Sequence, residues 1–305
     1  MWSNNGVFGA AIFHFSVKIH AETPTLCPPN AFVIRRRPKI RLTNADRDMM
    51  RQAGRFNARL MDEVRPHVRP GIKTSTIDKI VHEFTLDHGH IPACLGYPGE
   101  KQPFPKSCCI SVNDVICHGI PGRYELRSGD IVNVDLTTIV DGWHGDQSET
   151  FLVGGREAVA DETVSIVQCA FDCLHHAIDA IYPGCTVSTV GQTIVDYVTK
   201  NFDYGVVDKY VGHGIGQKFH QRPNVPHVPT RQSRQERLHP GMCFTIEPMI
   251  NGGTEKSICD PKDGWTVRTI DRKVSAQFEH TILMTEQGPE ILTLTENGPE
   301  PGHIF

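Results

Sequence analysis

The chain has little net charge and no long uninterrupted apolar run. Its 305 residues include 31 Lys and Arg against 35 Asp and Glu, for a formal net charge of −4. This balance offers no global electrostatic basis for binding DNA or an anionic membrane. The apolar run GVFGAAIFHFSV at residues 6–17 is too short to span a bilayer, and the MWSNN before it lacks the positive charge of a signal peptide. We therefore expect a cytoplasmic protein whose partner binds at a local site.

Cysteine pairs of the CxxC type are also absent, although the chain contains 10 cysteines. Most stand within apolar periodic segments rather than in a loop framework, among them Cys117, Cys169, Cys173 and Cys243. This usage is typical of reduced, buried thiols in a cytosolic protein and argues against a disulfide scaffold.

Residues 1–39 are interpreted as an N-terminal extension. It leads into a basic run, RRRPKIR, at residues 35–41. A run this short is typical of a solvated linker, and the alternative is contact with RNA, as at a ribosome surface.

Two pairs of helices are predicted by apolar residues that recur every three or four positions. The first helix begins near Asn44 and stops at RPG, residues 69–71; the second is expected to be capped by Thr74. The second pair repeats this order, with a stop at YPG, residues 182–184. The apolar stripe of the first helix consists of Met50, Ala53, Phe56, Leu60 and Val64.

The spacing of these segments indicates an internal duplication. PGIKTSTI at Pro70 aligns with PGCTVSTV at Pro183, an offset of 183 − 70 = 113. SGDIVNVDL and PGMCFTIEP align through Gly129 and Gly241, an offset of 241 − 129 = 112. A near-constant offset across helix, helix and strand predicts a repeated αβ unit whose two halves face each other across a pseudo-twofold axis.

The segment NVDLTTIVDGWHGDQS, residues 133–148, is predicted to be a β-hairpin with a two-residue Asp-Gly turn. Val140 then faces Trp143, and Asp135 faces Ser148. Asp146 lies diagonally from Asp135 on the same face, because residues two apart on a strand share a side. The opposite face consists of buried Val132, Val134 and Leu136.

Two carboxylates on one face repel each other unless one is protonated or a cation lies between them. We take Glu247 in FTIEPM and Glu279 in QFEHTILM as the second-half counterparts of Asp135 and Asp146, and GHGIG adds His213. Two divalent cations would balance four acids, and oxygen-rich ligation with one nitrogen suits Mn, Fe, Co or Zn. The pattern predicts a two-metal hydrolase.

Each of these residues has a simpler explanation when it is considered alone. An Asp beside a turn is usually a cap, and an isolated His is more often a hydrogen-bonded core residue than a metal ligand. The occurrence of all five in related positions favours the metal site.

The motifs VNVDLTTIVDGWHGDQSETFLVG, YVGHGIGQKFHQRP, GMCFTIEPMIN and QFEHTIL together resemble those of the type I methionine aminopeptidases of peptidase family M24. The resemblance extends from about residue 40 to residue 294. It implies an α+β pita-bread fold, with two pseudo-twofold-related αβ halves around a central antiparallel sheet. The catalytic domain would then occupy residues 40–305, with the internal repeat at about 44–153 and 161–294.

The resemblance also implies residue roles. Two divalent cations, with Co, Mn, Fe, Zn and Ni as candidates, would be bound by Asp135, Asp146, His213, Glu247 and Glu279. A hydroxide bridging them would attack the first peptide bond of nascent proteins and peptides, releasing the N-terminal methionine, with Glu247 as general base. His220 would donate a hydrogen bond to the scissile carbonyl oxygen, and His118 would contact the peptide nitrogen. The enzyme is expected to be a monomer.

A methionine pocket is implied at Tyr97, Phe104, Cys109, Phe219 and Trp265, with Cys94 and Met249 nearby. Aromatic edges and soft sulfur suit an unbranched thioether, and core packing is the alternative for these residues. The segment CLGYPGEKQPFPKS, residues 94–107, is longer than the family pattern between its tyrosine and PKS. A structural monovalent cation is implied near Asn113, Val115 and Ser275.

Three alternatives are weighed against this interpretation: two related enzymes and a non-catalytic protein. A proline-specific pita-bread hydrolase would share the ligands but usually carries a large N-terminal domain, which some forty residues cannot form. A type II methionine aminopeptidase would carry an extra subdomain between His220 and Glu247, which here are only 247 − 220 = 27 positions apart. A non-catalytic binding module would lack some of the ligands, whereas all five are present here.

Overall fold

The structure is a computed structural model that describes residues 40–305. The predicted N-terminal extension, the apolar run at residues 6–17 and most of the basic run at residues 35–41 lie outside the described residues. Within residues 40–305, no helix is long and apolar enough to cross a membrane. All nine cysteines in this part of the chain are free thiols, and all but Cys259 are buried, as the sequence predicted.

The first helix pair follows the predicted pattern, with one correction. Helix α1 spans Asn44–Val64 and begins with a capping box in which Thr43 and Asp46 bond each other's backbone N–H groups. A short 3₁₀ helix, Arg65–His67, follows, and α2 spans Thr74–Asp87. Thr74 does not cap α2, because it is the first helical residue and Lys73 holds the cap position. Its hydroxyl instead bonds both the N–H and the carbonyl of Gly122, fastening a distant loop.

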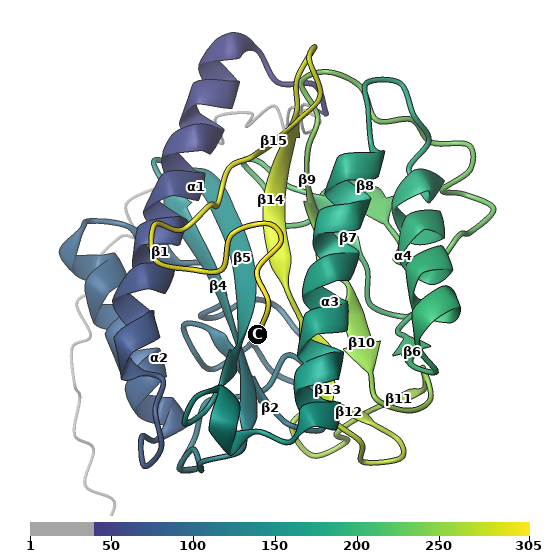
Figure 1. Cartoon of the computed structure of the whole chain (residues 1–305). Helices are drawn as coiled ribbons and strands as arrows, with labels where there is room; N and C mark the ends of the chain where they lie inside the picture. The colour runs from purple at the N-terminus through teal and green to yellow at the C-terminus, as the bar shows by residue number, and fades with distance from the viewer. Residues whose placement is uncertain (1–39) are drawn as a thin grey trace, which may run out of the picture. The chain divides into compact units, whose positions relative to one another are not determined.

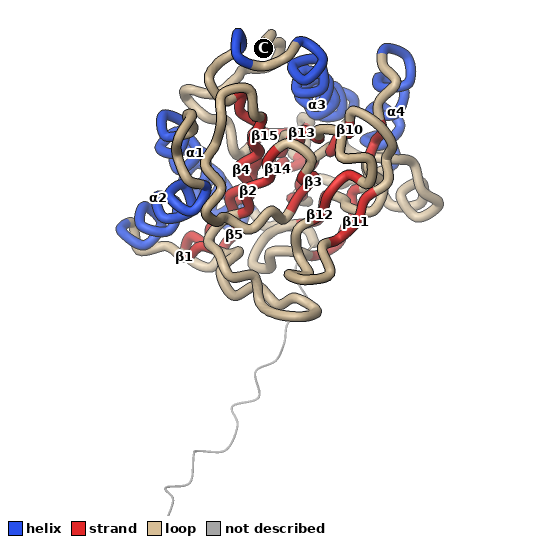
Figure 2. Tube along the Cα trace, turned by 90° about the horizontal axis from the view of Figure 1, so that it is seen from below, coloured by secondary structure: helices blue, strands red, loops and turns tan. Residues whose placement is uncertain are grey.

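The second helix pair consists of α3, Asp161–Ala180, and α4, Ser188–Asn201, after a 3₁₀ turn at Arg156–Ala158. Figure 1 shows α1 and α2 over one half of the central sheet and α3 over the other half, with α4 beside α3. Seen from below in Figure 2, the two helix pairs flank the strands β4, β5 and β14. The helices bury one face of the sheet and leave the opposite face for the site.

The central sheet has nine strands, and all of its pairings are antiparallel. Its strand order is β1 (Ile91–Pro92), β4 (Ile131–Val140), β5 (Trp143–Leu152), β14 (Glu279–Met284), β9 (Cys243–Ile246), β7 (Gly212–Gly214), β8 (Gln221–Val225). Strand β2 (Cys109–Val112) also pairs with β4, and β15 (Pro289–Ile291) pairs with β14.

Two small three-stranded sheets complete the described fold. One contains β13 (Ser275–Gln277), β10 (Met249–Asn251) and β6 (Gly205–Val206). The other contains β11 (Ser257–Cys259), β12 (Val267–Thr269) and β3 (Val115–Cys117). This mixture of helices with a curled antiparallel sheet confirms the predicted α+β class.

The two halves repeat the same backbone contacts. In the first half, Lys73 forms an isolated bridge with Glu125. The equivalent bridge in the second half joins Thr186 to Arg237, so the offsets are 186 − 73 = 113 and 237 − 125 = 112. These values equal the offsets found in the sequence, and they place Asp135 in correspondence with Glu247.

The inner strands β5 and β14 follow a different offset. Val153 N donates to Asp130 O, and Met284 N donates to Met242 O, each at 2.9 Å, so the displacement here is 284 − 153 = 131. Glu279 therefore corresponds to Ser148, with which it also pairs across the two strands. The expectation that Glu279 is the counterpart of Asp146 was wrong, because two turn residues join β4 to β5, whereas residues 247–278, which include β10 to β13, join β9 to β14.

The hairpin β4–β5 has the predicted register. Val140 pairs with Trp143, and Asp135 pairs with Ser148. The turn residues Asp141 and Gly142 both have positive φ, 49° and 84°, which matches the right-handed twist of the flanking strands. On one face of β4, Val132, Val134 and Leu136 are fully buried in the core formed with α1 and α2. Asp135 must therefore point to the opposite face.

Candidate metal centre

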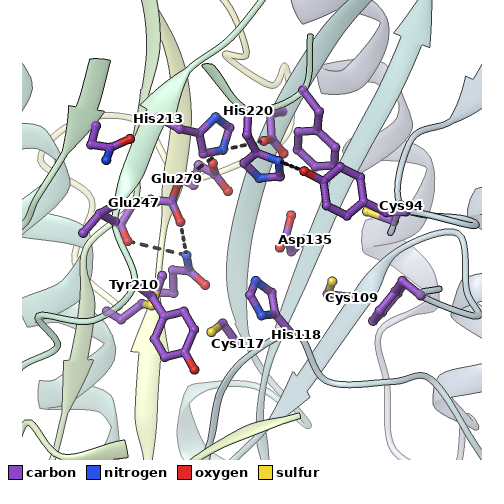
Figure 3. A pocket seen from close by; sticks show the side chains of 18 of the residues that line it. Cys94, Cys109, Cys117, His118, Asp135, Tyr210, His213, His220, Glu247 and Glu279 are labelled. Atoms are coloured by element: carbon purple, nitrogen blue, oxygen red, sulfur yellow. Dashed lines mark hydrogen bonds and ion pairs between the residues drawn. The ribbon is translucent and has the colours of Figure 1, made fainter. Parts of the chain in front are cut away.

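Five polar side chains that lie far apart in the sequence line one cavity on the helix-free face of the central sheet. They come from the middle of β4, β5 and β7, from the residue after β9 and from the first residue of β14, and they are Asp135, Asp146, His213, Glu247 and Glu279. These are the five predicted metal ligands. Figure 3 shows Asp135, His213, Glu247 and Glu279 from these elements around a common space.

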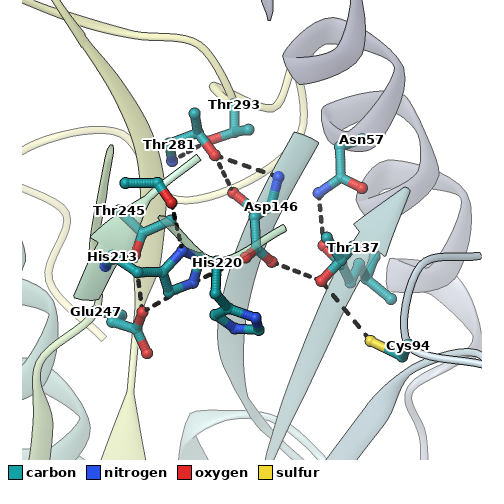
Figure 4. Close-up of polar contacts among 12 residues, drawn as sticks. Asn57, Cys94, Thr137, Asp146, His213, His220, Thr245, Glu247, Thr281 and Thr293 are labelled. Atoms are coloured by element: carbon teal, nitrogen blue, oxygen red, sulfur yellow. Dashed lines mark hydrogen bonds and ion pairs between the residues drawn. The ribbon is translucent and has the colours of Figure 1, made fainter. Parts of the chain in front are cut away.

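Ligand atoms of Asp146, His213 and Glu279 lie close enough together to share a cation. His213 Nε2 lies 3.5 Å from Asp146 Oδ2 and 3.7 Å from Glu247 Oε1. One donor atom each from Asp146, His213 and Glu279 lies within 4.8 Å of the other two. Figure 4 shows His213 between Asp146 and Glu247.

Burial makes this concentration of acids energetically costly. Asp146 and Glu279 are each 3% exposed, and Glu247 is 9% exposed. Desolvation, reinforced by repulsion from Asp146, raises the pKa of Asp135 and of Glu279 well above the ordinary range. Desolvation also raises the pKa of Glu247 to about 7, although the nearby His213 opposes the shift.

His213 is the only basic side chain in ion-pair distance of these four acids within the part of the chain that the structure describes. Burial opposes a charge on its imidazole, but the contacts with Asp146 and Glu247 raise its pKa. One imidazole cannot balance four carboxylates. The donor set, oxygen-rich with a single nitrogen, fits divalent cations such as Mn, Fe, Co or Zn.

Three polar neighbours, which the sequence analysis missed, orient the carboxylates. Thr137 Oγ1 donates to Asp146 Oδ1 at 2.8 Å, and Thr245 Oγ1 donates to Glu247 Oε1 at 2.8 Å. Gln277 Nε2 lies 3.3 Å from the other oxygen of Glu247. Such supporting bonds fix the orientation of metal ligands. The two threonines carried a signal in the sequence: Thr137 pairs with Asp146, and Thr245 precedes Glu247 by two positions.

Two further histidines, both predicted from the sequence, line the same cavity. His118 follows β3 with a positive φ of 55°, and desolvation in the cavity lowers its pKa to about 4. Desolvation and the nearby His213 lower the pKa of His220 to about 3, so both rings are neutral at pH 7. The hydroxyl of Tyr97 contacts His220 Nδ1 at 2.7 Å, and the ring of Phe219 stacks on the His220 ring at 4.1 Å.

An apolar cluster forms one wall of the cavity, whose volume is about 540 Å³. It brings together all five residues of the predicted methionine pocket, Tyr97, Phe104, Cys109, Phe219 and Trp265. Cys94 belongs to the same cluster, and Met249 lines the cavity. Sequence reasoning missed Cys117 and Tyr210, which also line it, and Tyr210 stands edge-on to His118 with ring centroids 5.6 Å apart.

The residues of the predicted monovalent-cation site are also near one another. Ser275 N donates to Asn113 O at 2.9 Å, and Val115 follows Asn113 by two positions. The Ser275 hydroxyl is buried without a hydrogen-bond partner. Nothing in the structure identifies a cation here, so this site stays a prediction.

Comparisons of the sequence and of the structure with known proteins point to the same family. The model of metallopeptidase family M24 matches residues 48–286. Methionine aminopeptidase A of Synechocystis sp. is 47% identical over 256 residues, which cover 84% of this chain and 97% of that protein. Methionine aminopeptidase of Escherichia coli is 44% identical over 264 residues, which cover 86% of this chain and 96% of that protein.

The crystal structure of methionine aminopeptidase from Rickettsia prowazekii superposes with a TM-score of 0.78 at 42% identity, and the match covers 83% of this chain and 99% of that chain. A prolidase from Pyrococcus furiosus shares the fold at 19% identity and a TM-score of 0.64, and this chain covers 66% of it. The fold shared with these proteins is the pita-bread fold. The chain belongs to metallopeptidase family M24 and, within it, to the methionine aminopeptidases.

Proposed function

We propose that this protein removes the N-terminal methionine from nascent polypeptides and peptides, using two divalent cations bound by Asp135, Asp146, His213, Glu247 and Glu279. The observation that supports the proposal is that the five predicted ligand side chains, two neutral histidines and an apolar pocket open into one cavity. When bound, the cations would balance the acids and lower the pKa of the water that attacks the first peptide bond.

Glu247 is suited to accept a proton from that water. Without bound cations, desolvation raises its pKa to about 7, so this carboxyl holds a proton more strongly than an exposed glutamate. Thr245 and Gln277 hold its two carboxylate oxygens, so the acceptor has a fixed direction. Because Glu247 would also be a ligand, the positive charge of the bound cations would lower this pKa and keep the carboxylate ionised.

His220 is suited to stabilise the negative charge that develops on the scissile carbonyl oxygen. If the Tyr97 hydroxyl donates to Nδ1, the ring proton of the neutral imidazole is on Nε2, which then acts as a hydrogen-bond donor. His118, also neutral, is suited to contact the peptide nitrogen on the leaving side. The aromatic and thiol groups of the pocket would hold the methionine thioether.

Release of free methionine from the peptide Met-Ala-Ser, in added Mn²⁺ or Co²⁺, tests this function. We expect turnover in the wild type and loss of most turnover in His118→Ala and Glu247→Ala. His67→Ala, in the 3₁₀ helix and outside the cavity lining, is the matched control and retains activity. Cleavage of an Xaa-Pro peptide without release of methionine would favour the proline-specific alternative. Partner binding that survives chelation, with no turnover on any peptide, would favour a binding module.

The basic run at residues 35–41 supports a separate proposal, association with the ribosome. The full chain is expected to cosediment with ribosomes in a salt-dependent manner. Cosedimentation that is unchanged after deletion of residues 1–39 would refute this role for the run. The monomeric state and the cytoplasmic location also stay predictions.

A further inference from the structure

The segment between Tyr97 and Phe104, residues 98–103 (PGEKQP, the clamp segment), lies against a second loop, residues 260–266 (DPKDGWT, the tryptophan turn). Lys101 Nζ donates to the carbonyl of Pro261, and Gln102 Nε2 donates to the carbonyl of Asp263 at 3.2 Å. In the reverse direction, Trp265 Nε1 donates to the carbonyl of Gln102 at 3.0 Å. The two loops are therefore joined by three hydrogen bonds.

The clamp segment is anchored on the pocket side by a short backbone ladder. Phe104 N donates to Tyr97 O at 2.9 Å, and Gly96 N donates to Phe104 O at 2.8 Å. These bonds close the loop around residues 98–103 and place Phe104, 3% exposed, in the pocket wall. Tyr97 and Phe104 line the cavity, whereas residues 98–103 between them do not, so the clamp segment lies outside this wall.

Trp265 is held at three points, one on its backbone and two on its ring. Its backbone N–H donates to Asp263 Oδ1 at 2.8 Å, and its ring N–H is held by Gln102 as described. The third contact is Gly99: a Cβ added there would overlap Trp265 Cζ2 and lie 2.6 Å from the carbonyl oxygen of Gln102, so no larger residue fits without moving the ring or the loop. Inside the pocket, Trp265 meets Phe104 edge to face, with ring centroids 5.2 Å apart.

We propose that the clamp segment is a positioning element for Trp265 and thereby sets how strongly the pocket prefers methionine over branched or aromatic N-terminal side chains. This inference rests on the proposed function. A fixed ring keeps the pocket narrow enough for an unbranched side chain. A ring that is pushed or released changes the pocket width while the reacting groups on the central sheet stay in place.

Gly99→Ala is the sharpest perturbation. Gly99 does not have the positive φ that disfavours other residues, so the added methyl acts through two contacts: the Trp265 ring and, at 2.6 Å, the carbonyl oxygen of Gln102, which accepts the ring N–H. We expect KM for Met-Ala-Ser to rise about tenfold with kcat changed less than about twofold, and the preference over Leu-Ala-Ser to fall about tenfold. Glu100→Ala, in the same exposed segment, is the matched control and leaves unchanged both KM for Met-Ala-Ser and the preference over Leu-Ala-Ser. The double variant Lys101→Ala/Gln102→Ala, which weakens the docking without a clash, changes selectivity in the same direction.

Tryptophan fluorescence reports the ring directly. In a Trp2→Phe background the emission comes from Trp265 and from Trp143, which is only 5% exposed. Acrylamide quenching is expected to increase in both clamp variants and not in Glu100→Ala. Wild-type selectivity in a Gly99→Ala protein would overturn the proposal, whether or not its quenching changed. A wild-type protein that releases no methionine at all would instead refute the function on which the inference rests.

Discussion

Removal of divalent cations is expected to destabilise the protein at neutral pH and to matter little at about pH 5. Asp135, Glu247 and Glu279 all have a pKa raised by desolvation and by neighbouring acids. A carboxyl with a pKa higher in the folded state than in the unfolded state favours folding only while it is protonated. That stability is complete below the unfolded pKa of about 4 and is lost as the pH rises through the folded pKa.

Glu247 gives the scale of the effect. Its pKa rises from the ordinary 4.5 to about 7. Because a tenfold change in proton affinity corresponds to about 1.4 kcal/mol, ionising this carboxyl in the metal-free fold costs about 3 kcal/mol. For a domain of this size, that loss lowers the melting temperature by roughly 10 °C between about pH 5 and about pH 8. Asp135 and Glu279 act in the same direction.

Scanning calorimetry of chelator-treated and Mn²⁺-loaded protein, at fixed ionic strength across this pH range, measures the difference. The gap between the two forms is expected to widen as the pH rises. Glu247→Gln, which cannot ionise, should show a flatter pH dependence without metal. A metal-free protein whose melting temperature stayed constant or rose towards about pH 8 would refute the reasoning.

Three further predictions concern single side chains. His220→Ala is expected to lower kcat for Met-Ala-Ser about a hundredfold at an unchanged melting temperature; near-normal turnover would remove it from the mechanism. Phe104→Ala opens the pocket wall, so steady-state kinetics are expected to show KM raised about tenfold with kcat nearly unchanged. A fall in kcat as large as the rise in KM would contradict a role in binding alone. Arg65→Ala leaves Glu149, 8% exposed, without its bidentate partner. Urea denaturation is expected to show unfolding free energy lowered by about 3 kcal/mol, and a loss under about 1 kcal/mol would mean that the pair is dispensable.

The hairpin that carries two of the acids was predictable because local rules specify it. Alternating side chains fix the buried face, and the two-residue turn fixes the register, so Asp135 had to face away from the core. The correspondence of Asp135 with Glu247 followed from a repeat that is visible in the sequence.

Features that depend on contacts between distant segments were not predictable in this way. The sequence around Thr74 favours a helix cap at this residue. In the structure its hydroxyl instead forms hydrogen bonds with the backbone of Gly122, which is distant in the sequence. The offset between β5 and β14 changes to 131, because loop length before a strand is not constrained by the repeat. Gln277 and Tyr210 are the first residues of the motifs QFEHTIL and YVGHGIGQKFHQRP, but the motifs alone did not show that these side chains line the cavity. Their roles became visible only when the two halves were brought together.

The most direct measurement is an anomalous difference map at the manganese edge from crystals of the protein grown with Mn²⁺. Two peaks in the cavity, each in contact with oxygen or nitrogen atoms from the set Asp135, Asp146, His213, Glu247 and Glu279, are the predicted result. Peaks elsewhere, or a cavity without manganese at saturating concentration, would contradict the assignment of these side chains as a two-cation centre.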